Sequence, residues 1–432
     1  MFRYSHLLCF IALAFCLPRL AGSETMLSLP TLLLKARDQN PDILAARQAW
    51  KVSQAQISPT GTWPDPTWTY IDEKFPSGTP GMEAEKIKHY RVEQAIPFPG
   101  KLSGDAQMKY HETLIDESKY RAAMLTVFRD VRMRFYQLYL TDQKIDLAAQ
   151  SVDVLKNALK TAQARLASGQ SSASDVFMAQ TELRRMENEL FEQHQQRALI
   201  AIELNTLLNQ PTDSAVGQAE APTLVDLPLT LAQFRKVAQN NAPEYMTAMH
   251  ELNHARAMTS RNRLSWAPDF GVMYEREAAA SGDAGRQIGV NVTFPLWFNR
   301  PWNLSKAADE HEKEAKASSE SMQNEVLKMI HTEMTEVQTH LGLARNYETG
   351  ILPSATSSLR IARQQYASGR GDFLRLLEAF RTWIEAHNQY QDQVYHYAEH
   401  WSELGRWLGV EVDHAKEAQD QMGIMPMGSH HE

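Results

Sequence analysis

Long stretches of the chain place apolar residues at intervals of three and four and contain no proline. Over residues 102–166 this spacing is unbroken and the only glycine is Gly104, which predicts one continuous helix. At ~1.5 Å per residue such a helix extends about 100 Å, several times the length usual in a globular domain. A second helical stretch over 175–208 follows a break at 167–174, so the two are expected to form an antiparallel hairpin with its turn at Gly169.

A second hairpin of the same kind is predicted from about Leu304 to Leu408, with its turn at 369–372. Gly350 and Pro353 are expected to interrupt its first helix, because proline lacks the amide N–H that a helix interior uses. The fold class is therefore mainly α, built on duplicated long helical hairpins.

Short stretches with a period of two precede each hairpin. Ile288, Val290, Val292 and Phe294 alternate with small or polar residues, which predicts a strand with one apolar face. Four strands are expected, at about 68–75, 88–97, 269–277 and 288–297. Membrane barrels need at least ~8 strands, so four strands close a barrel only across several copies of the chain, and three copies supply twelve.

The chain repeats itself once. The sequence LSLPTLLLKARDQNP at 27–41 matches LTLAQFRKVAQNNAP at 229–243, and Ala-Ser-Gly at 167–169 returns at 367–369. A period this long indicates a duplicated half-molecule rather than a solenoid unit. The two repeats are predicted at 24–220 and 221–412.

The first residues are typical of a secretory signal peptide, predicted at 1–23, with an apolar run from Leu7 to Leu17 followed by small residues. Cys9 and Cys16 both lie within it. Lipid attachment at Cys16 is left open beside its interpretation as an apolar signal residue, because Phe15 is large for the position before a lipidated cysteine. The formal net charge of −8 argues against nucleic acid as a partner.

Aromatic and proline-rich corners follow the strands. The sequence IPFPGK ends the strand before the first hairpin, and FPLWFNRP over 294–301 precedes the second. Aromatic residues beside a basic one are typical of a membrane–water boundary, which makes Phe98, Trp297 and Phe298 candidates for membrane-interface residues. The alternative is an ordinary strand-to-helix corner in a soluble protein.

With these motifs the chain resembles the TolC-like outer-membrane factor family, most closely its CzcC-like heavy-metal efflux branch. The resemblance rests on Asn40-Pro41 and Ala242-Pro243, on FPGK at 98–101, on FPLWFNR at 294–300 and on the two hairpin turns. It implies a homotrimer with a twelve-stranded β-barrel in the outer membrane and an α-helical tunnel in the periplasm. It also implies a passive channel without catalysis or cofactor, whose partners are outer-membrane lipid, a periplasmic adaptor and an inner-membrane pump of the RND type. The implied substrates are heavy-metal cations such as Cu/Ag or Co/Zn/Cd.

The resemblance places the periplasmic entrance and the adaptor-docking surface at the two hairpin turns. The family has a glycine followed six residues later by aspartate, which Gly169 and Asp175 match, whereas Arg375 takes the aspartate position after Gly369. A ring of three Arg375 side chains in the trimer is expected either to pair with Asp175 or Glu378 and latch the entrance, or to weaken cation selectivity there. The gate candidates are Asp175, Asp372, Arg375 and Glu378, and the docking candidates are Gly169, Ser171, Ser172, Gly369 and Gly371. The alternative is that these are ordinary helix-cap and first-turn residues on a solvated loop.

Three groups of residues offer metal ligands. The HExxH sequence at 250–254 has zinc-protease spacing, but the matching segment 48–52 of the first repeat has no ligand, so a solvated helix face is favoured. His396, His400 and Glu403 share one helical face, where helix packing is favoured over metal binding. The tail at 413–432 offers thioethers and imidazoles that suit Cu(I) or Ag(I), alongside the alternative of a disordered tail; its candidates are Met422, Met425, Met427, His430 and His431.

Three competing functions remain beside the metal efflux channel. A duct for drugs or organic compounds has the same architecture, and a periplasmic coiled-coil adaptor or structural protein uses the same long helices but lacks strands with aromatic ends. A zinc hydrolase rests on the HExxH sequence alone.

Overall fold

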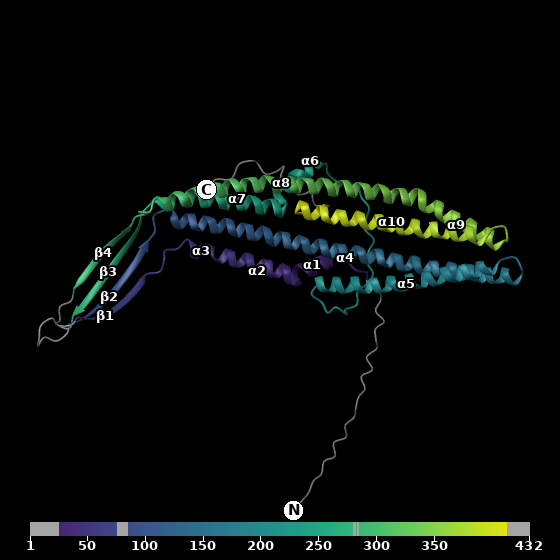
Figure 1. Cartoon of the computed structure of the whole chain (residues 1–432), viewed down its shortest axis with the longest axis horizontal. Helices are drawn as coiled ribbons and strands as arrows, with labels where there is room; N and C mark the ends of the chain where they lie inside the picture. Colours follow the sequence, from purple (N-terminus) through teal and green to yellow (C-terminus); the bar gives the residue numbers. More distant parts are fainter. Residues whose placement is uncertain (1–25, 76–84, 280–281, 283–284, 413–432) are drawn as a thin grey trace, which may run out of the picture.

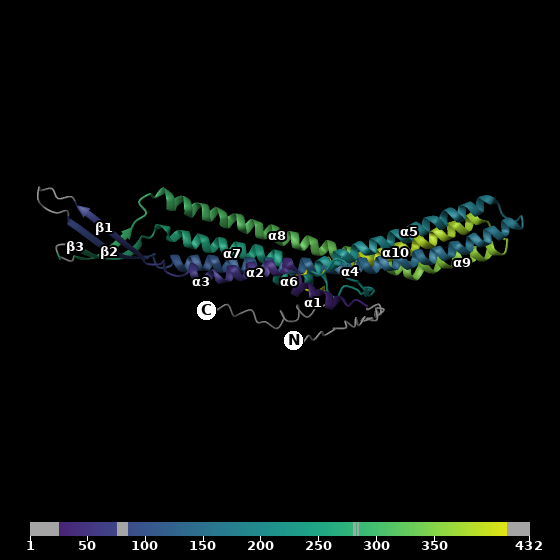
Figure 2. The same ribbon diagram turned by 90° about the horizontal axis from the view of Figure 1, so that it is seen from below.

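The computed structural model describes residues 26–75, 85–279, 282 and 285–412. The molecule is elongated: the strands gather at one end and the turns of the two helical hairpins at the other (Figures 1 and 2). The predicted signal peptide with Cys16, and the tail with its methionines and histidines, lie outside the described residues.

The first half contains α1 (Leu29–Gln39), α2 (Pro41–Ala55), α3 (Ile57–Thr60), α4 (Lys101–Ala167) and α5 (Ala173–Leu207). Helix α4 has 67 residues, so the long helix expected from the spacing of apolar residues is confirmed. Asn40 starts α2 by accepting hydrogen bonds from the backbone N–H groups of Asp42 and Ile43, and its amide donates to the carbonyl of Leu207 at the end of α5 (2.9 Å).

The second half contains α6 (Leu231–Asn241), α7 (Pro243–Arg263), the 3₁₀ turn η1 (Leu264–Trp266), α8 (Asn299–Asn346), α9 (Leu352–Ala367) and α10 (Phe373–Leu408). The expected interruption at Gly350 and Pro353 is present, but as a change of helix type and not as a break in the chain of helical turns. A single π-helical turn, η2 (Tyr347–Ile351), joins α8 to α9 without a break. Pro353 lies in the first turn of α9, and the wider turn before it absorbs the missing hydrogen bond.

The four strands form one antiparallel sheet in the order β1-β2-β3-β4. They are β1 (Thr67–Phe75), β2 (Glu85–Ile96), β3 (Asp269–Ala279) and β4 (Arg286–Thr293). Pairing of β2 with β3 joins the two halves of the molecule, whereas β1 and β4 each pair on one side only within the described sheet. Strand β4 ends at Thr293, earlier than the expected residue 297, because Pro295 has no N–H for the ladder.

The halves pack in the same way around separate apolar cores. Leu204 and Leu208 at the end of α5 are buried against α1 and α4, and their counterparts Leu404 and Leu408 are buried against α6 and α8. A third core joins both halves between α4, α5, α9 and α10, beneath the hairpin turns. The mainly α fold with a small sheet is thereby confirmed. None of the described helices carries an apolar stretch sufficient to span a membrane.

Candidate functional site

Two turns of nearly identical backbone lie together at the end of the molecule opposite the sheet (Figure 1). Tip 1, residues 168–175, joins α4 to α5, and tip 2, residues 368–375, joins α9 to α10. Gly169 and Gly369 have φ angles of 71° and 77°, the left-handed conformation with which glycine ends a helix. The repeated Ala-Ser-Gly sequence thus ends both α4 and α9.

Tip 1 starts its second helix with a serine and an aspartate. Ser172 is the N-cap of α5 and accepts a hydrogen bond from the backbone N–H of Asp175. The Asp175 carboxylate in turn accepts from the hydroxyls of Ser171 (2.7 Å) and Ser172 (3.1 Å). The acid of this tip is therefore held by its own turn.

Tip 2 starts its second helix with an aspartate at the cap itself. The Asp372 carboxylate accepts a hydrogen bond of 2.8 Å from the backbone N–H of Arg375. Within a single chain the Arg375 guanidinium forms no ion pair with Asp175 or Glu378 among the described residues, so a latch made by a ring of three arginines stays a prediction. Asp175 is already bonded to two serines, and Glu378 lies exposed one turn further along α10.

The two tips line a common hollow of about 620 Å³. Of the residues predicted for gating and docking, Glu378 alone is missing from its lining. The lining contains Gly169, Ser171, Ser172, Asp175, Gly369, Gly371, Asp372 and Arg375. Backbone groups and charged side chains of both signs thus face one space at the end of the helical hairpins.

Arg165 ties the two tips together, and sequence reasoning missed it. Its guanidinium donates to the carbonyls of Tyr366 (2.8 Å) and Gly371 (3.3 Å) in the second half and of Gln170 (3.1 Å) in its own tip. It also lies 4.6 Å from the centroid of the Tyr366 ring. The counterpart of Arg165 in the second repeat is Gln365. This difference between the repeats is the feature of the sequence that could have indicated a special role for Arg165.

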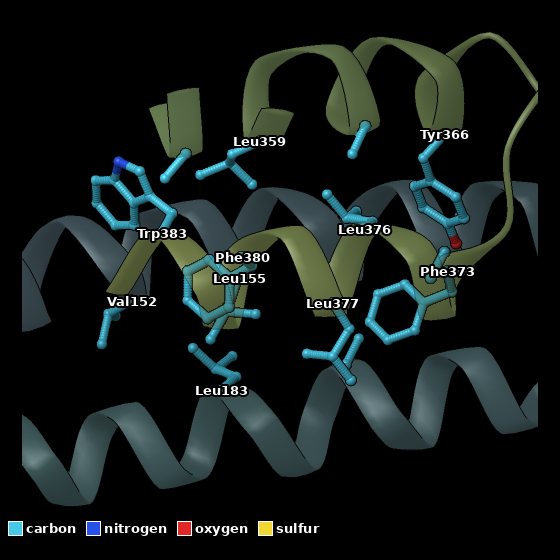
Figure 3. Close-up of a cluster of buried hydrophobic side chains, with 14 of the residues drawn as sticks. Val152, Leu155, Leu183, Leu359, Tyr366, Phe373, Leu376, Leu377, Phe380 and Trp383 are labelled. Atoms are coloured by element: carbon cyan, nitrogen blue, oxygen red, sulfur yellow. The ribbon is translucent and has the colours of Figure 1, made fainter. Parts of the chain in front are cut away.

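A buried core supports the tips (Figure 3). Tyr366, at the end of α9, meets Phe373 edge to face with 5.6 Å between ring centroids. Burial, together with the nearby Asp175 charge, raises the pKa of the Tyr366 hydroxyl, so it stays protonated at neutral pH. The tips therefore rest on an apolar core shared by the ends of four helices.

An ion pair with a buried carboxylate joins α5 to α10 beside this core. The Glu182 carboxylate is 2.9 Å from the Arg381 guanidinium and 3.4 Å from that of Arg185. Burial alone would raise the pKa of Glu182, but the hydrogen bonds and charges of Arg381 and Arg185 outweigh it and hold this pKa below its ordinary value. Glu182 is therefore ionised at neutral pH.

At the opposite end of the molecule the sheet has one apolar and one polar face. The strand pairing aligns Trp68, Val92, Tyr274 and Ile288 in a row across all four strands. The large side chains of this face are exposed, reaching 82% for Ile288 and 68% for Val290. The remaining exposed members of this apolar band are Tyr70, Tyr90, Phe270, Val272 and Val292.

The other face of the sheet carries acidic residues and one histidine. Glu275 is buried between His89 (Nδ1 to Oε1, 2.7 Å) and Arg91 (2.8 Å). Asn291 donates to Glu93 (3.0 Å). Glu73 and Glu277 lie on the same face, next to His89. The alternation predicted from the sequence therefore separates an apolar surface from a charged one.

The corners between strands and helices differ in exposure. Trp297 is 79% exposed and Phe298 is 67% exposed and stacks on Trp266, whereas Phe98 is half-buried. A further pair at the first corner was not predicted: Lys101 Nζ lies 2.8 Å from the Asp269 carboxylate, to which the Phe98 N–H also donates. This pair locks the start of α4 to the start of β3.

The histidines of the HExxH sequence do not lie on a solvated helix face as expected. Helix α7 packs between α4 and α8, which half-buries His250 and His254. Burial is the main cause that lowers the pKa of both. Glu403, grouped with His396 and His400 in the sequence, instead pairs with Arg406 (2.9 Å) and Arg129 (3.3 Å).

Comparison with known proteins gives this arrangement a family. The family model described as outer membrane efflux protein matches residues 90–210 and 235–410. The cobalt-zinc-cadmium resistance protein CzcC of Cupriavidus metallidurans is 22% identical over 381 residues, covering 84% of this chain and 85% of that protein.

Solved structures of outer-membrane channels have the same fold. CusC superposes with a TM-score of 0.79 at 17% identity, covering 88% of this chain and 92% of that one. The outer membrane protein VceC of Vibrio cholerae superposes with a TM-score of 0.77 at 16% identity, covering 89% and 96%. The chain therefore belongs to the outer membrane efflux protein family, and it is a channel protein of the outer membrane that extends into the periplasm, not an enzyme.

Proposed function

We propose that three copies of this chain form the exit duct of a tripartite efflux system for heavy-metal cations. The two-faced sheet carries this proposal. Three sheets joined edge to edge form a twelve-stranded barrel with the band of Trp68, Tyr274 and Ile288 toward lipid and the face of Glu275 toward the lumen. The long hairpins then continue the lumen into the periplasm, where an inner-membrane pump and an adaptor deliver the substrate.

The hollow between the tips is the proposed periplasmic gate. Asp175, Asp372 and Arg375 line it, and Glu378 lies exposed beside it. Rings of such charges narrow a pore and set its ion selectivity. The small residues of the tips, Gly169, Ser171, Ser172, Gly369 and Gly371, are the proposed docking surface for the adaptor, since small side chains allow close approach of its helices.

Two observations support cations as substrates. The lumen-facing side of the sheet presents Glu73, Glu93 and Glu277 around His89 and Glu275, which attracts cations. The relative from Cupriavidus metallidurans is named for resistance to cobalt, zinc and cadmium. A duct for organic compounds is the alternative.

The test is resistance in a Gram-negative strain that carries a cobalt, zinc and cadmium pump and its adaptor but no exit duct. Expression of this chain should restore growth on the three metals and leave sensitivity to organic antibiotics unchanged. Restored growth on antibiotics without metal resistance overturns the substrate assignment. Recovery of the chain in the soluble periplasmic fraction supports the adaptor alternative instead.

The gate is tested by single-channel recording in planar bilayers. Replacing Arg375 by Asp restores the acid that the repeat has at Asp175, so cation preference should rise, and R375A should give an intermediate value. Arg184 on α5, 73% exposed and paired with Glu187, provides the control R184A. Equal selectivity in all four proteins rules out a role of tip 2 in the gate.

A further inference from the structure

Three histidine rings meet between α8 and α10, in the wall of the helical part. His340 comes from α8, and His396 and His400 come from successive turns of α10. The ring centroid of His340 lies 5.1 Å from that of His396 and 5.4 Å from that of His400. The two helices thus bring together imidazoles from distant parts of the sequence.

Each of the three rings is held through the same nitrogen. The Nδ1 atoms of His340, His396 and His400 lie 2.7 Å from Gln393 Oε1, 2.9 Å from Glu399 Oε2 and 2.8 Å from Glu333 Oε2. Ionised carboxylate and amide oxygens only accept hydrogen bonds, so each Nδ1 donates. In the neutral ring the lone pair is then on Nε2, and a hydrogen bond from the opposite nitrogen is how proteins orient metal-binding histidines.

A carboxylate completes the cluster. Single ligand atoms of Glu336, His340 and His400 all lie within 4.8 Å of one another, and Glu336 Oε2 is 3.7 Å from His340 Nε2. Bonds of ~2.1 Å from a metal to its ligands bring ligand atoms to within about 3.5 Å in a tetrahedral site. Small side-chain rotations supply the difference, since the Glu336 side chain is 42% exposed.

The charge around the rings also favours a cation. Glu333, Glu336 and Glu399 surround the three imidazoles. Imidazole with carboxylate is a ligand set for transition metals of intermediate softness, Zn²⁺ above all, rather than for Ca²⁺ or Mg²⁺.

We propose that His340, His400 and Glu336 bind a divalent transition-metal ion such as Zn²⁺, with Glu333 as a positioning residue. The ion bridges α8 and α10 and stiffens the wall of the channel above the tips. This inference goes beyond the proposed function, because the wall site holds its ion whether or not the channel transports cations.

The test is equilibrium dialysis of the purified full-length protein against Zn²⁺ after chelator treatment. The variant H340Q/H400Q should bind one zinc ion fewer per chain than the wild type. The control H194Q/H331Q removes two exposed histidines of α5 and α8 and should bind as the wild type does. The tail histidines are present in all three proteins, so any zinc that they bind does not contribute to the differences between the proteins. Equal binding by the wild type and H340Q/H400Q, or equal loss in the control, overturns the site.

Two further measurements do not depend on removing ligands. E333Q keeps the ligands but removes the charge behind His400, and it should weaken zinc binding about 10- to 100-fold without changing its stoichiometry. X-ray absorption of the full chain carrying H430Q/H431Q, loaded with one zinc ion per chain, should give at least two imidazole ligands. Unchanged affinity in E333Q, or a shell of oxygen ligands only, counts against the proposal. Failure of metal resistance in the growth test leaves these results unaffected.

Discussion

The turns at tip 1 and tip 2 share their backbone but place an acid at different positions of the following helix. In tip 1 the cap is Ser172 and the acid, Asp175, is three residues later; in tip 2 the acid, Asp372, is the cap itself. Both arrangements put a negative charge at a helix N-terminus, where unpaired N–H groups and the helix dipole favour it. Both repeats thus have a negative charge at the start of the helix. Because Asp372 supplies it in the second repeat, the position equivalent to Asp175 holds an arginine, Arg375.

The tips also differ in what holds them. Arg165 of the first half donates to the carbonyls of Tyr366 and Gly371 in the second half. Its counterpart Gln365 contributes its backbone carbonyl, which accepts from Ser368, Arg370 and Gly371 of its own tip. The Glu182–Arg381 pair has no mirror image either, since the equivalent positions are Thr382 and Thr181. The ties between the two halves therefore do not follow the symmetry of the repeat.

The largest effect is expected from removing the tie between the tips. R165A should lower the local opening free energy of the tip amides by about 3 kcal/mol, because several charge-assisted hydrogen bonds and a cation–π contact are lost together. Native-state hydrogen exchange measures this quantity. Q365A is the matched variant, expected within ~0.5 kcal/mol of wild type. Similar values for both would mean that the tips are held by their apolar core alone.

The second largest effect concerns the one-sided ion pair and depends on pH. The folded-state pKa of Glu182 is lowered, so the stabilisation is complete above the ordinary pKa and is lost as pH falls through the folded-state value. E182Q should cost about 1.5 kcal/mol at pH 7, and the difference from wild type should disappear in acid. Thermal unfolding at a series of pH values tests this. E187Q, in the exposed Arg184–Glu187 pair, should not change the pH profile.

Helix capping should differ between the tips by a smaller amount. D372A removes both a cap and a favourable charge, so the first turn of α10 should lose about 1 kcal/mol, and S172A should cost the first turn of α5 slightly less. Amide exchange at the two helix starts compares them directly. D372S should recover most of the loss. A larger effect of S172A would place the main stabilisation of tip 1 in the Ser172–Asp175 bonds.

The smallest effect on stability is expected from R375A. The Arg375 side chain is exposed, so opening of tip 2 should change by less than ~0.5 kcal/mol. Any change in ion selectivity of this variant is then attributable to charge rather than to altered folding. A clear loss of exchange protection in tip 2 would show that Arg375 has a structural partner in the assembled channel.

Local patterns predicted most of the fold. The helical spacing over 102–166, the glycine stops at Gly169 and Gly369 and the alternation from Ile288 to Phe294 each depend on near neighbours in sequence, and each is present. Gly350 and Pro353 indicated where the helix is interrupted, but not that the interruption is a π-helical turn.

Contacts between side chains of different helices and turns could not be predicted from the sequence. Asp175 was expected to be free for Arg375, but it is bound by serines of its own turn. His396 and His400 were recognised as neighbours on one face, while His340 required knowledge of which turn of α8 faces them. The sequence already shows that Arg165 and Arg375 differ from their counterparts in the other repeat. Of the two, Arg165 makes the hydrogen bonds that join the tips.

The one-sided pairing of β1 and β4 has a consequence for how the protein reaches its membrane. A lone chain inserted in lipid would leave two rows of N–H and C=O groups without partners, and each such group costs several kcal/mol in hydrocarbon. For the proposed trimer, insertion and association are then expected to be a single event, whose rate rises steeply with the concentration of chains at the membrane surface. Lowering the concentration of chains should therefore slow membrane insertion at concentrations where an assembled channel does not yet dissociate.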